Sequence, residues 1–288
     1  MKQLITILLT LTIGFAQSLS KEEKQIRSYI DNHTNEAIYL VEKVVNINSG
    51  TLNFKGNKKV GKIFQAELDK LGFKTYWVTY PKEIKRSGHL FAEMRGGKGQ
   101  NILLIGHLDT VFEPDHPFQK YTRKGDTAYG PGVSDMKAGD VSMIYIMKAL
   151  DKIGVLHDLN LTLAFTGDEE KTGGPVSIVR KELVEAGKWA NIGLGFEGAV
   201  GMNTGTIARR SSSSWVLTTT GIQGHSSQIF KDHLGYGAIF EASRILNAFR
   251  EELAPEEYLT FNPGTIVGGT DVTYDPVNSK GTIFGKTN

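Results

Sequence analysis

The sequence of 288 residues contains no cysteine. Without cysteine the chain forms no disulfide, has no thiolate ligand for a metal and cannot use a thiol as a nucleophile. An exported protein of this composition would depend on the size of its core or on a metal for stability. Any metal that it binds must be held by histidine, aspartate and glutamate side chains.

The chain also lacks an excess of either charge. Its 33 basic and 31 acidic residues give a formal net charge of +2, and no long run carries one sign. Proteins that bind nucleic acids usually show a basic patch or stripe, so the composition argues against a nucleic-acid partner. The 40% hydrophobic and 22% charged fractions are those of an ordinary globular protein with one large domain or two smaller ones.

The N-terminal apolar run, Leu4–Ile13, is shorter than the roughly 20 residues that a membrane-spanning helix needs. It follows Lys2 and precedes the small residues Gly14 and Ala16. This pattern predicts a cleaved secretory signal over residues 1–17, with an N-terminal membrane anchor as the alternative. We therefore expect a secreted or periplasmic protein that has no membrane contact once the signal is removed.

Apolar runs and helical patterns alternate between residues 101 and 196. The runs 101–106, 161–165 and 192–196 are separated by helical spacing over 136–153 and 175–186. This alternation predicts an α/β fold with a mostly parallel sheet flanked by helices. Helices over 21–48 and 60–71 and strands over 73–79 and 89–94 precede it, so we place a catalytic domain at 18–205.

A second, smaller α+β domain is predicted at 206–288, because the composition changes near Gly205. We expect strands over 215–220 and 258–267 and a helix over 234–253. No further helix follows Ile283 to complete the domain, so we expect both domains to be incomplete in this chain.

Polar side chains follow each of the three apolar runs. His107 and Asp109 follow the first, Glu169 and Glu170 the second, and Glu197 the third. In open parallel sheets, ligands bind beyond the carboxyl ends of the strands, so we expect these side chains to meet there.

Asp135, in the turn-rich stretch 130–139, adds a further carboxylate. Several buried carboxylates repel one another unless cations lie between them, and a pair of divalent metals would remove that cost. Of the neighbours Glu169 and Glu170, one can bind metal while the other serves as general base toward a metal-bound water.

Each of these signals has a plainer interpretation when it is taken alone. The His107 and Asp109 pair is common on solvated loops, adjacent glutamates often start a helix, and Gly130-Pro131-Gly132 is typical of a turn. The meeting of three strand ends at one rim is what favours a metal site.

In order and spacing, the motifs GHLDTV, GPGVSDMKAG, TGDEE, FEG and GHSS resemble the dizinc metallopeptidase family of glutamate carboxypeptidase, aminoacylase and succinyl-diaminopimelate desuccinylase. The resemblance runs from about Glu22 to the end of the chain, and it is greatest for the glutamate carboxypeptidase branch. It implies a zinc-peptidase catalytic domain with an inserted dimerisation domain.

The resemblance also implies roles for individual residues. His107 and Glu197 would bind one zinc ion, Glu170 the second, and Asp135 would bridge both. The other implied roles are Glu169 as general base, Asp109 as the partner that orients His107, His225 as a donor to the oxyanion in the partner subunit's site, and Arg210 and Asn262 as substrate contacts.

The function that this resemblance implies is hydrolysis of an amide or peptide bond next to a free carboxylate, in a small peptide or N-acyl amino acid, by a homodimer with two zinc ions per site. Within the family, the alternatives are an aminoacylase, a dipeptidase or a deacylase. The family's last zinc-binding histidine has no counterpart here, which leaves the second zinc site incomplete and admits a non-catalytic fragment as another alternative. A metal-dependent phosphohydrolase is disfavoured because no cluster of basic residues lies near the motifs.

Overall fold

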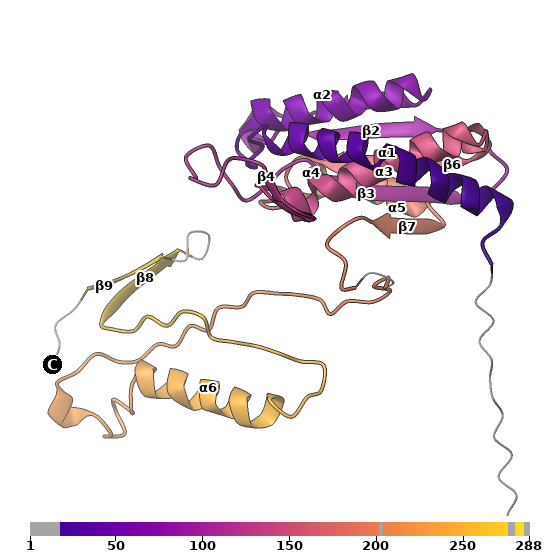
Figure 1. The fold of residues 1–288 in the computed structure, drawn as a ribbon. Helices are drawn as coiled ribbons and strands as arrows, with labels where there is room; N and C mark the ends of the chain where they lie inside the picture. The colour runs from indigo at the N-terminus through magenta and orange to yellow at the C-terminus, as the bar shows by residue number, and fades with distance from the viewer. Residues whose placement is uncertain (1–17, 202–203, 276–279, 285–288) are drawn as a thin grey trace, which may run out of the picture. The chain divides into compact units, whose positions relative to one another are not determined.

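The computed structural model describes residues 18–201, 204–275 and 280–284 (Figure 1). It divides into two compact units between Gly205 and Thr206. The predicted signal segment, residues 1–17, lies outside the described residues. No helix in the described part of the chain combines the length and apolar content needed to span a bilayer.

Unit 1 is built on a five-stranded sheet with the strand order β1-β2-β6-β3-β7. The strands are β1 (Lys74–Val78), β2 (His89–Met94), β3 (Asn101–His107), β6 (Asn160–Thr166) and β7 (Ile192–Gly195). Strands β6, β3 and β7 run parallel to one another, whereas β2 pairs antiparallel with both β6 and the edge strand β1. The predicted α/β class is confirmed, with a sheet that is mixed outside its three parallel strands.

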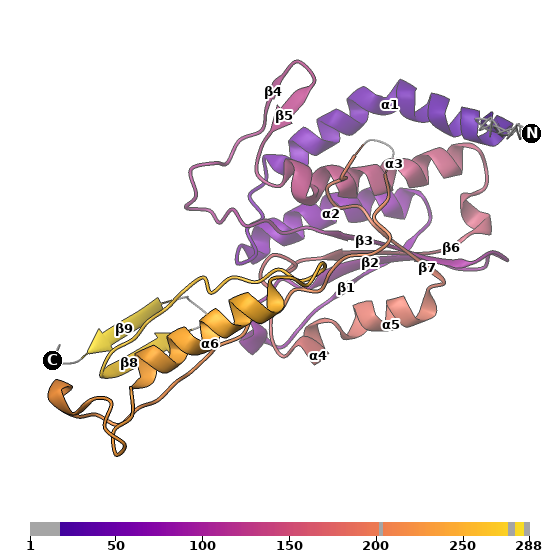
Figure 2. The ribbon, with the colours of Figure 1, turned by 90° about the horizontal axis from the view of Figure 1, so that it is seen from below.

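Helices cover both faces of this sheet (Figure 2). One face carries α1 (Lys21–Val45), α2 (Phe54–Lys70) and α3 (Ala138–Lys152), and the other carries α4 (Val176–Val179) and α5 (Lys181–Trp189). The larger core lies under the three long helices and includes the fully buried Val60, Phe64, Ile144, Leu163 and Phe165. The segments with helical apolar spacing thus form helices, because each helix buries its apolar face against the sheet.

The register of the parallel strands decides which residues share the carboxyl edge. His107 of β3 lies opposite Thr166 of β6, so Gly167 and the residues after it leave β6 at the height of His107. Ile105 of β3 lies opposite Gly195 of β7, and two residues further along both strands reach His107 and Glu197. The alternation of strand and helix therefore brings three polar segments to one edge of the sheet.

Two local features of unit 1 differ from the prediction. The helix expected over 175–186 is interrupted at Arg180, whose backbone (φ −108°, ψ 3°) leaves the helical region between α4 and α5. A hairpin of β4 (Thr122–Lys124) and β5 (Thr127–Tyr129) was not predicted. Its strands are only three residues long, too short for an alternating pattern to stand out, and Gly125 supplies the positive φ of its turn.

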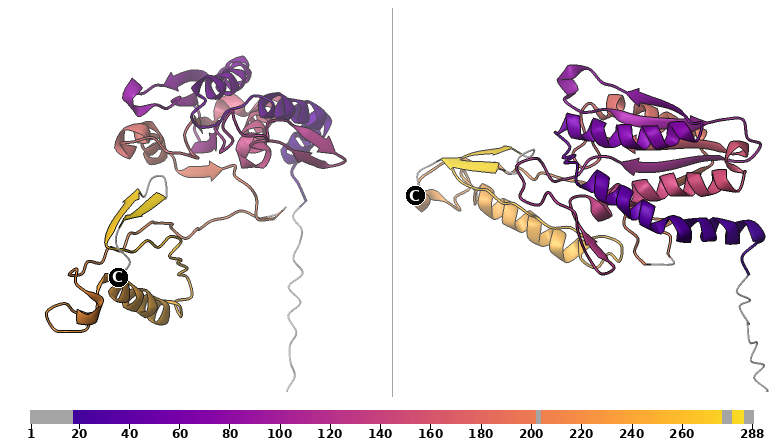
Figure 3. Two further views of the ribbon diagram at one scale, coloured as in Figure 1. Left: turned by 90° about the vertical axis from the view of Figure 1, so that its left-hand side faces the viewer. Right: turned by 45° about the horizontal axis from the view of Figure 1, so that its top comes forward.

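The regular elements of unit 2 include α6 (Ala238–Leu253) and a hairpin of β8 (Asp271–Asp275) and β9 (Lys280–Phe284), joined by long irregular segments (Figure 3). The predicted helix is confirmed in α6. The strands predicted over 215–220 and 258–267 are wrong, because neither segment pairs with a neighbour among the described residues. A strand needs a partner for its backbone, and β8 and β9 pair with each other close by in the sequence.

Candidate metal centre

His107 is the central side chain at the carboxyl edge of the sheet. It ends β3, is 1% exposed, and its Nδ1 lies 3.0 Å from the carbonyl oxygen of Asp109. Because a carbonyl oxygen only accepts, Nδ1 carries the hydrogen, and Nε2 is the nitrogen that faces the acidic side chains. The histidine therefore presents the nitrogen that a metal would take.

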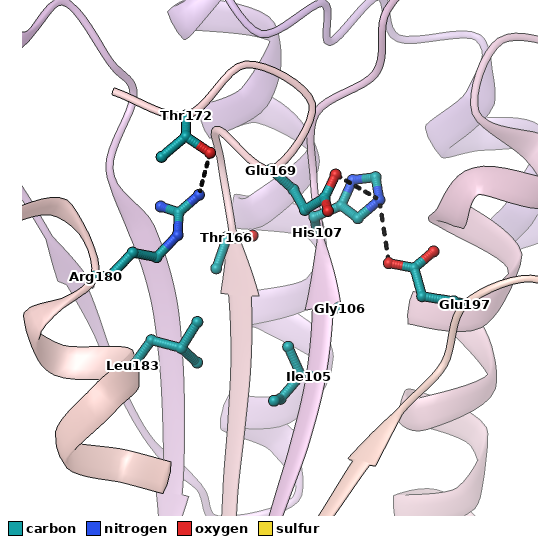
Figure 4. A pocket seen from close by; sticks show the side chains of 9 residues that line it. All are labelled: Ile105, Gly106, His107, Thr166, Glu169, Thr172, Arg180, Leu183 and Glu197. Carbon is teal, nitrogen blue, oxygen red and sulfur yellow. Dashed lines mark hydrogen bonds and ion pairs between the residues drawn. The ribbon is translucent and has the colours of Figure 1, made fainter. Parts of the chain in front are cut away.

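Three acidic side chains surround Nε2 of His107. Asp135 Oδ1 lies 2.9 Å away, Glu197 Oε1 3.7 Å away and Glu169 Oε2 4.0 Å away. Figure 4 shows His107, Glu169 and Glu197 pointing toward one another from separate segments of the chain. Asp135 approaches from the irregular turn Val133–Lys137 that precedes α3.

His107, Asp135 and Glu197 form a group whose ligand atoms all lie within 4.8 Å of one another. Ligands at the usual zinc distances in a tetrahedral site are separated by about 3.3 Å, close to the spacings between His107 Nε2 and the two carboxylates. Imidazole nitrogen and carboxylate oxygen are both ligands that zinc takes in proteins. These residues therefore fit a divalent metal ion.

A buried lysine holds the turn that presents Asp135. Lys137 is fully buried, and its Nζ donates to the carbonyl oxygens of Val44 and Ile47, each at 3.1 Å. A cation at the C-terminal end of α1 satisfies carbonyls that have no partner within the helix. Burial lowers the pKa of Lys137 to about 8, against the opposing charge of Asp140. The turn is thereby fastened to α1.

Asp109 joins His107 to the segment that carries the two glutamates. Its buried carboxylate accepts hydrogen bonds from the backbone nitrogens of Glu169 (3.0 Å) and Glu170 (3.1 Å) and lies 3.5 Å from His107 Nδ1. Burial raises the pKa of Asp109, but the hydrogen bonds from His107 and Thr51 outweigh it and hold the pKa below its usual value. Asp109 is therefore an anion held between His107 and the backbone of the two glutamates, and its role in orienting His107 stays a prediction.

Glu170 lies close to Asp135 without belonging to the group of three. Burial and the negative charge of Asp135 raise the pKa of Glu170 to about 7. The raised pKa means that the ionised form of Glu170 is disfavoured beside Asp135. A nearby cation would stabilise that ionised form. Its role as ligand to a second metal stays a prediction.

A buried ion pair supports the same segment from behind. Asp168 is fully buried; its Oδ1 lies 2.5 Å from Arg180 Nη1, and its Oδ2 accepts from the backbone nitrogen of Gly173 at 2.8 Å. Arg180 Nη2 also donates to Asp168 O and Thr172 Oγ1. The break between α4 and α5 at Arg180 thus coincides with the residue that closes this loop.

Electrostatics in the crevice favour a positive charge at His107. Burial opposes protonation of the ring, but the hydrogen bond and charge of Asp109 and the charges of Asp140 and Glu197 raise the pKa of His107 to about 10. Asp140 is itself fully buried with neither carboxylate oxygen hydrogen-bonded among the described residues, and burial raises its pKa well above the usual value. A Cβ on Gly106 would lie 2.1 Å from Asp140 Oδ1, so only glycine fits there.

We expect the metal-free protein to lose stability as the pH rises from about 6.5 to about 10. The folded-state pKa of His107 is raised from 6.5 to about 10, so its contribution is complete below 6.5 and disappears as the pH passes 10. The change in the free energy of unfolding should be on the order of a few kcal/mol. Urea unfolding in the presence of a chelator, repeated at several pH values, measures it, and His107→Asn should give a flatter profile.

The remaining predicted residues belong to unit 2. His225 is exposed, and its Nδ1 accepts from the backbone nitrogen of Ser227 at 3.2 Å. Arg210 donates to the carbonyl oxygen of Tyr258 at 3.3 Å, and Asn262 is exposed. Their roles in oxyanion and substrate binding stay predictions.

A cavity of about 330 Å³ adjoins the acidic cluster (Figure 4). His107, Glu169 and Glu197 line it at the strand ends, and Thr172, Arg180 and Leu183 line it on the side of α5. No sequence pattern marked Arg180, whose partner Asp168 lies 12 residues away, or Thr51, whose partner Asp109 lies 58 residues away. Asp168 directly precedes Glu169 and Glu170 in the sequence, and this adjacency was the only hint that it belongs to the site.

Comparisons with known proteins identify the family of this chain. The model of peptidase family M20/M25/M40 matches residues 103–287. Carboxypeptidase G2 of Pseudomonas sp. (strain RS-16) is 32% identical over 217 residues, which cover 73% of this chain and 49% of that protein. Succinyl-diaminopimelate desuccinylase of Gluconobacter oxydans (strain 621H) is 29% identical over 201 residues, which cover 66% and 49%.

The chain belongs to peptidase family M20/M25/M40. This confirms the family expected from the five motifs. The chain spans about half the length of these two relatives. Among solved structures, human carnosine dipeptidase 1 aligns with a TM-score of 0.51 and 18% identity, over 69% of this chain and 43% of that one, and it supports the fold.

Proposed function

We propose that this chain carries the metal centre of a zinc-dependent hydrolase that cleaves an amide or peptide bond next to a free carboxylate, of the glutamate carboxypeptidase type. The observation that carries the proposal is the approach of Asp135 and Glu197 to Nε2 of His107, with Glu169 beside them. Membership of a peptidase family and the similarity to carboxypeptidase G2 support it.

Each residue at the rim has a distinct task in this proposal. His107 and Glu197 would hold one zinc ion, Glu170 would hold a second, and Asp135 would be shared by both. Bound zinc would polarise the scissile carbonyl and lower the pKa of a bound water. Glu169 would accept a proton from water at its carboxylate and return it to the leaving nitrogen, because its carboxylate borders the site while its backbone is fixed by Asp109.

Metal titration tests the proposal. We expect the purified chain to bind zinc and Asp135→Ala to bind it at least about 100-fold more weakly, since the variant loses a ligand from the only such group found in the described residues. Isothermal titration measures the affinity, and Glu36→Ala, an exposed carboxylate on α1, is the matched control.

Hydrolysis of N-acylated glutamate, other N-acyl amino acids and dipeptides, before and after chelation, distinguishes the activities within the family. Turnover that stops with chelator and returns with zinc supports the hydrolase. Zinc binding without turnover on this panel favours a metal-binding module instead. A chain that binds no zinc contradicts the metal centre itself.

We also propose that the protein is exported and acts as a homodimer through unit 2. The apolar N-terminal sequence supports export, and the exposed apolar side chains Ile239 and Phe240 on α6 suit contact with a second copy. Cell fractionation tests the first proposal, and light scattering of the purified chain tests the second.

A further inference from the structure

The carboxylate of Asp109 connects three segments that are far apart in the sequence. Its Oδ1 accepts from Glu169 N and lies near His107 Nδ1, and its Oδ2 accepts from Glu170 N. The fourth partner is the hydroxyl of Thr51, which donates to Oδ2 at 2.7 Å and comes from the segment between α1 and α2. Thr51 is the nearest of these partners and, unlike His107, Glu169 and Glu170, has no proposed role of its own.

Hydrogen bonds hold the backbone around Thr51. This residue is 2% exposed, and its backbone nitrogen donates to the carbonyl oxygen of Thr110 at 3.2 Å. Thr110 N in turn donates to Ser49 O at 3.0 Å, and Gly50 forms a parallel bridge with Thr110. The side chain of Asn57 fixes Gly50 O at 3.0 Å. The backbone that carries the Thr51 side chain is therefore held in place beside Asp109.

An aspartate carboxylate rotates about χ2 between broadly populated orientations unless its oxygens are held separately. In this site Oδ1 and Oδ2 must face different partners at once, since each accepts from one of two successive backbone nitrogens. The hydroxyl of Thr51 gives Oδ2 a second donor and further restricts rotation of the carboxylate. The buried environment strengthens the effect, because no solvent competes for the bond.

We propose that Thr51 is a positioning residue of the metal centre, which fixes the carboxylate of Asp109 so that His107 and the Glu169–Glu170 backbone keep their places. The expected effect on zinc binding rests on the proposed metal centre. The inference also has a consequence that needs no metal, which is slow hydrogen exchange at the amides of Glu169 and Glu170.

The test compares Thr51→Val, which keeps the shape of the side chain and removes the hydroxyl, with Thr51→Ser, which keeps the hydroxyl. We expect Thr51→Val to weaken zinc binding about 10-fold, the lower end of the range for groups bonded directly to metal ligands, because Thr51 acts through Asp109, and Thr51→Ser to stay within about threefold of the wild type. In the metal-free chain, NMR should show amide exchange at Glu169 and Glu170 about tenfold faster in Thr51→Val alone.

The matched control is Thr162→Val. Thr162 is also a buried threonine of unit 1, and its hydroxyl accepts from Arg95 Nη2 near the start of β6, away from the carboxyl edge. It should lower stability without changing zinc affinity or the exchange at Glu169 and Glu170. If Thr51→Val does not fold, Thr51→Ala removes the hydroxyl without placing a methyl group against the carboxylate.

The outcomes separate this inference from the proposed function. Unchanged amide exchange in Thr51→Val, equal losses in Thr51→Val and Thr51→Ser, or an equal loss in Thr162→Val would each overturn the positioning role. A wild-type chain that binds no zinc would overturn the proposed function, and faster exchange in Thr51→Val would then still show that the hydroxyl holds the loop.

Discussion

Glu169→Ala is expected to reduce kcat by about 10²- to 10⁴-fold, the range that a general base contributes. Its Oε2 lies 4.0 Å from His107 Nε2, and its side chain is 53% exposed, so the carboxylate borders the crevice and can reach water. Glu169 stands outside the group of three ligand atoms within 4.8 Å of one another. The variant should therefore keep its zinc affinity within a few-fold.

Steady-state assays on N-acylated glutamate, paired with zinc titration of the same preparations, measure both effects. Glu169→Gln is the closer variant, because it keeps the shape and removes the basic oxygen. Glu36→Ala again controls for the loss of one carboxylate. Full activity in Glu169→Ala, or a loss of zinc that matches the loss of activity, would contradict the role as general base.

Asp168→Asn is expected to lower the free energy of unfolding by about 3–5 kcal/mol, as is usual when one partner of a buried ion pair is removed. Asp168 is fully buried and accepts from Arg180 and from the backbone nitrogen of Gly173. His89 lies 3.8 Å from Asp168, but a histidine ring is either neutral or positive and cannot replace the lost negative charge. Arg180 would be left without its anion.

Urea unfolding followed by circular dichroism measures this change. The exposed pair of Glu185 and Lys188 on α5 provides the comparison, and Glu185→Gln should leave the midpoint unchanged. The double variant Asp168→Asn/Arg180→Met should recover part of the loss, because it removes the unpaired cation. A midpoint for Asp168→Asn equal to that of the wild type would show that the pair does not stabilise the loop.

The sequence was sufficient to predict the carboxyl edge of the sheet. Continuous apolar runs indicate buried parallel strands. Polar residues directly after such strands lie at the carboxyl edge of the sheet, whatever the details of packing. His107, Glu169 and Glu197 come together for this reason. Asp135 joins them through a turn and not through a strand, so its place followed from the family motif.

The sequence was insufficient where structure depends on partners distant in the chain. The segments 215–220 and 258–267 have the composition of strands, but a strand forms only where another segment supplies hydrogen bonds. A helical pattern breaks at Arg180, and the guanidinium of this residue binds Asp168, a contact that no local propensity records. The contact of Thr51 with Asp109 spans 58 residues and is equally invisible in a local pattern.

The parallel register of β3 with β6 and β7 makes the metal centre intolerant of changes in length. One extra residue inside β6 or β7 would shift the following acid by about 3.3 Å relative to His107, which is more than a zinc–ligand bond. The turn at Gly96–Gly99, which lies before β3 begins, carries no such constraint. Insertions and deletions in this chain should therefore be tolerated in its loops and should disrupt the cluster when they fall between a strand and its acid.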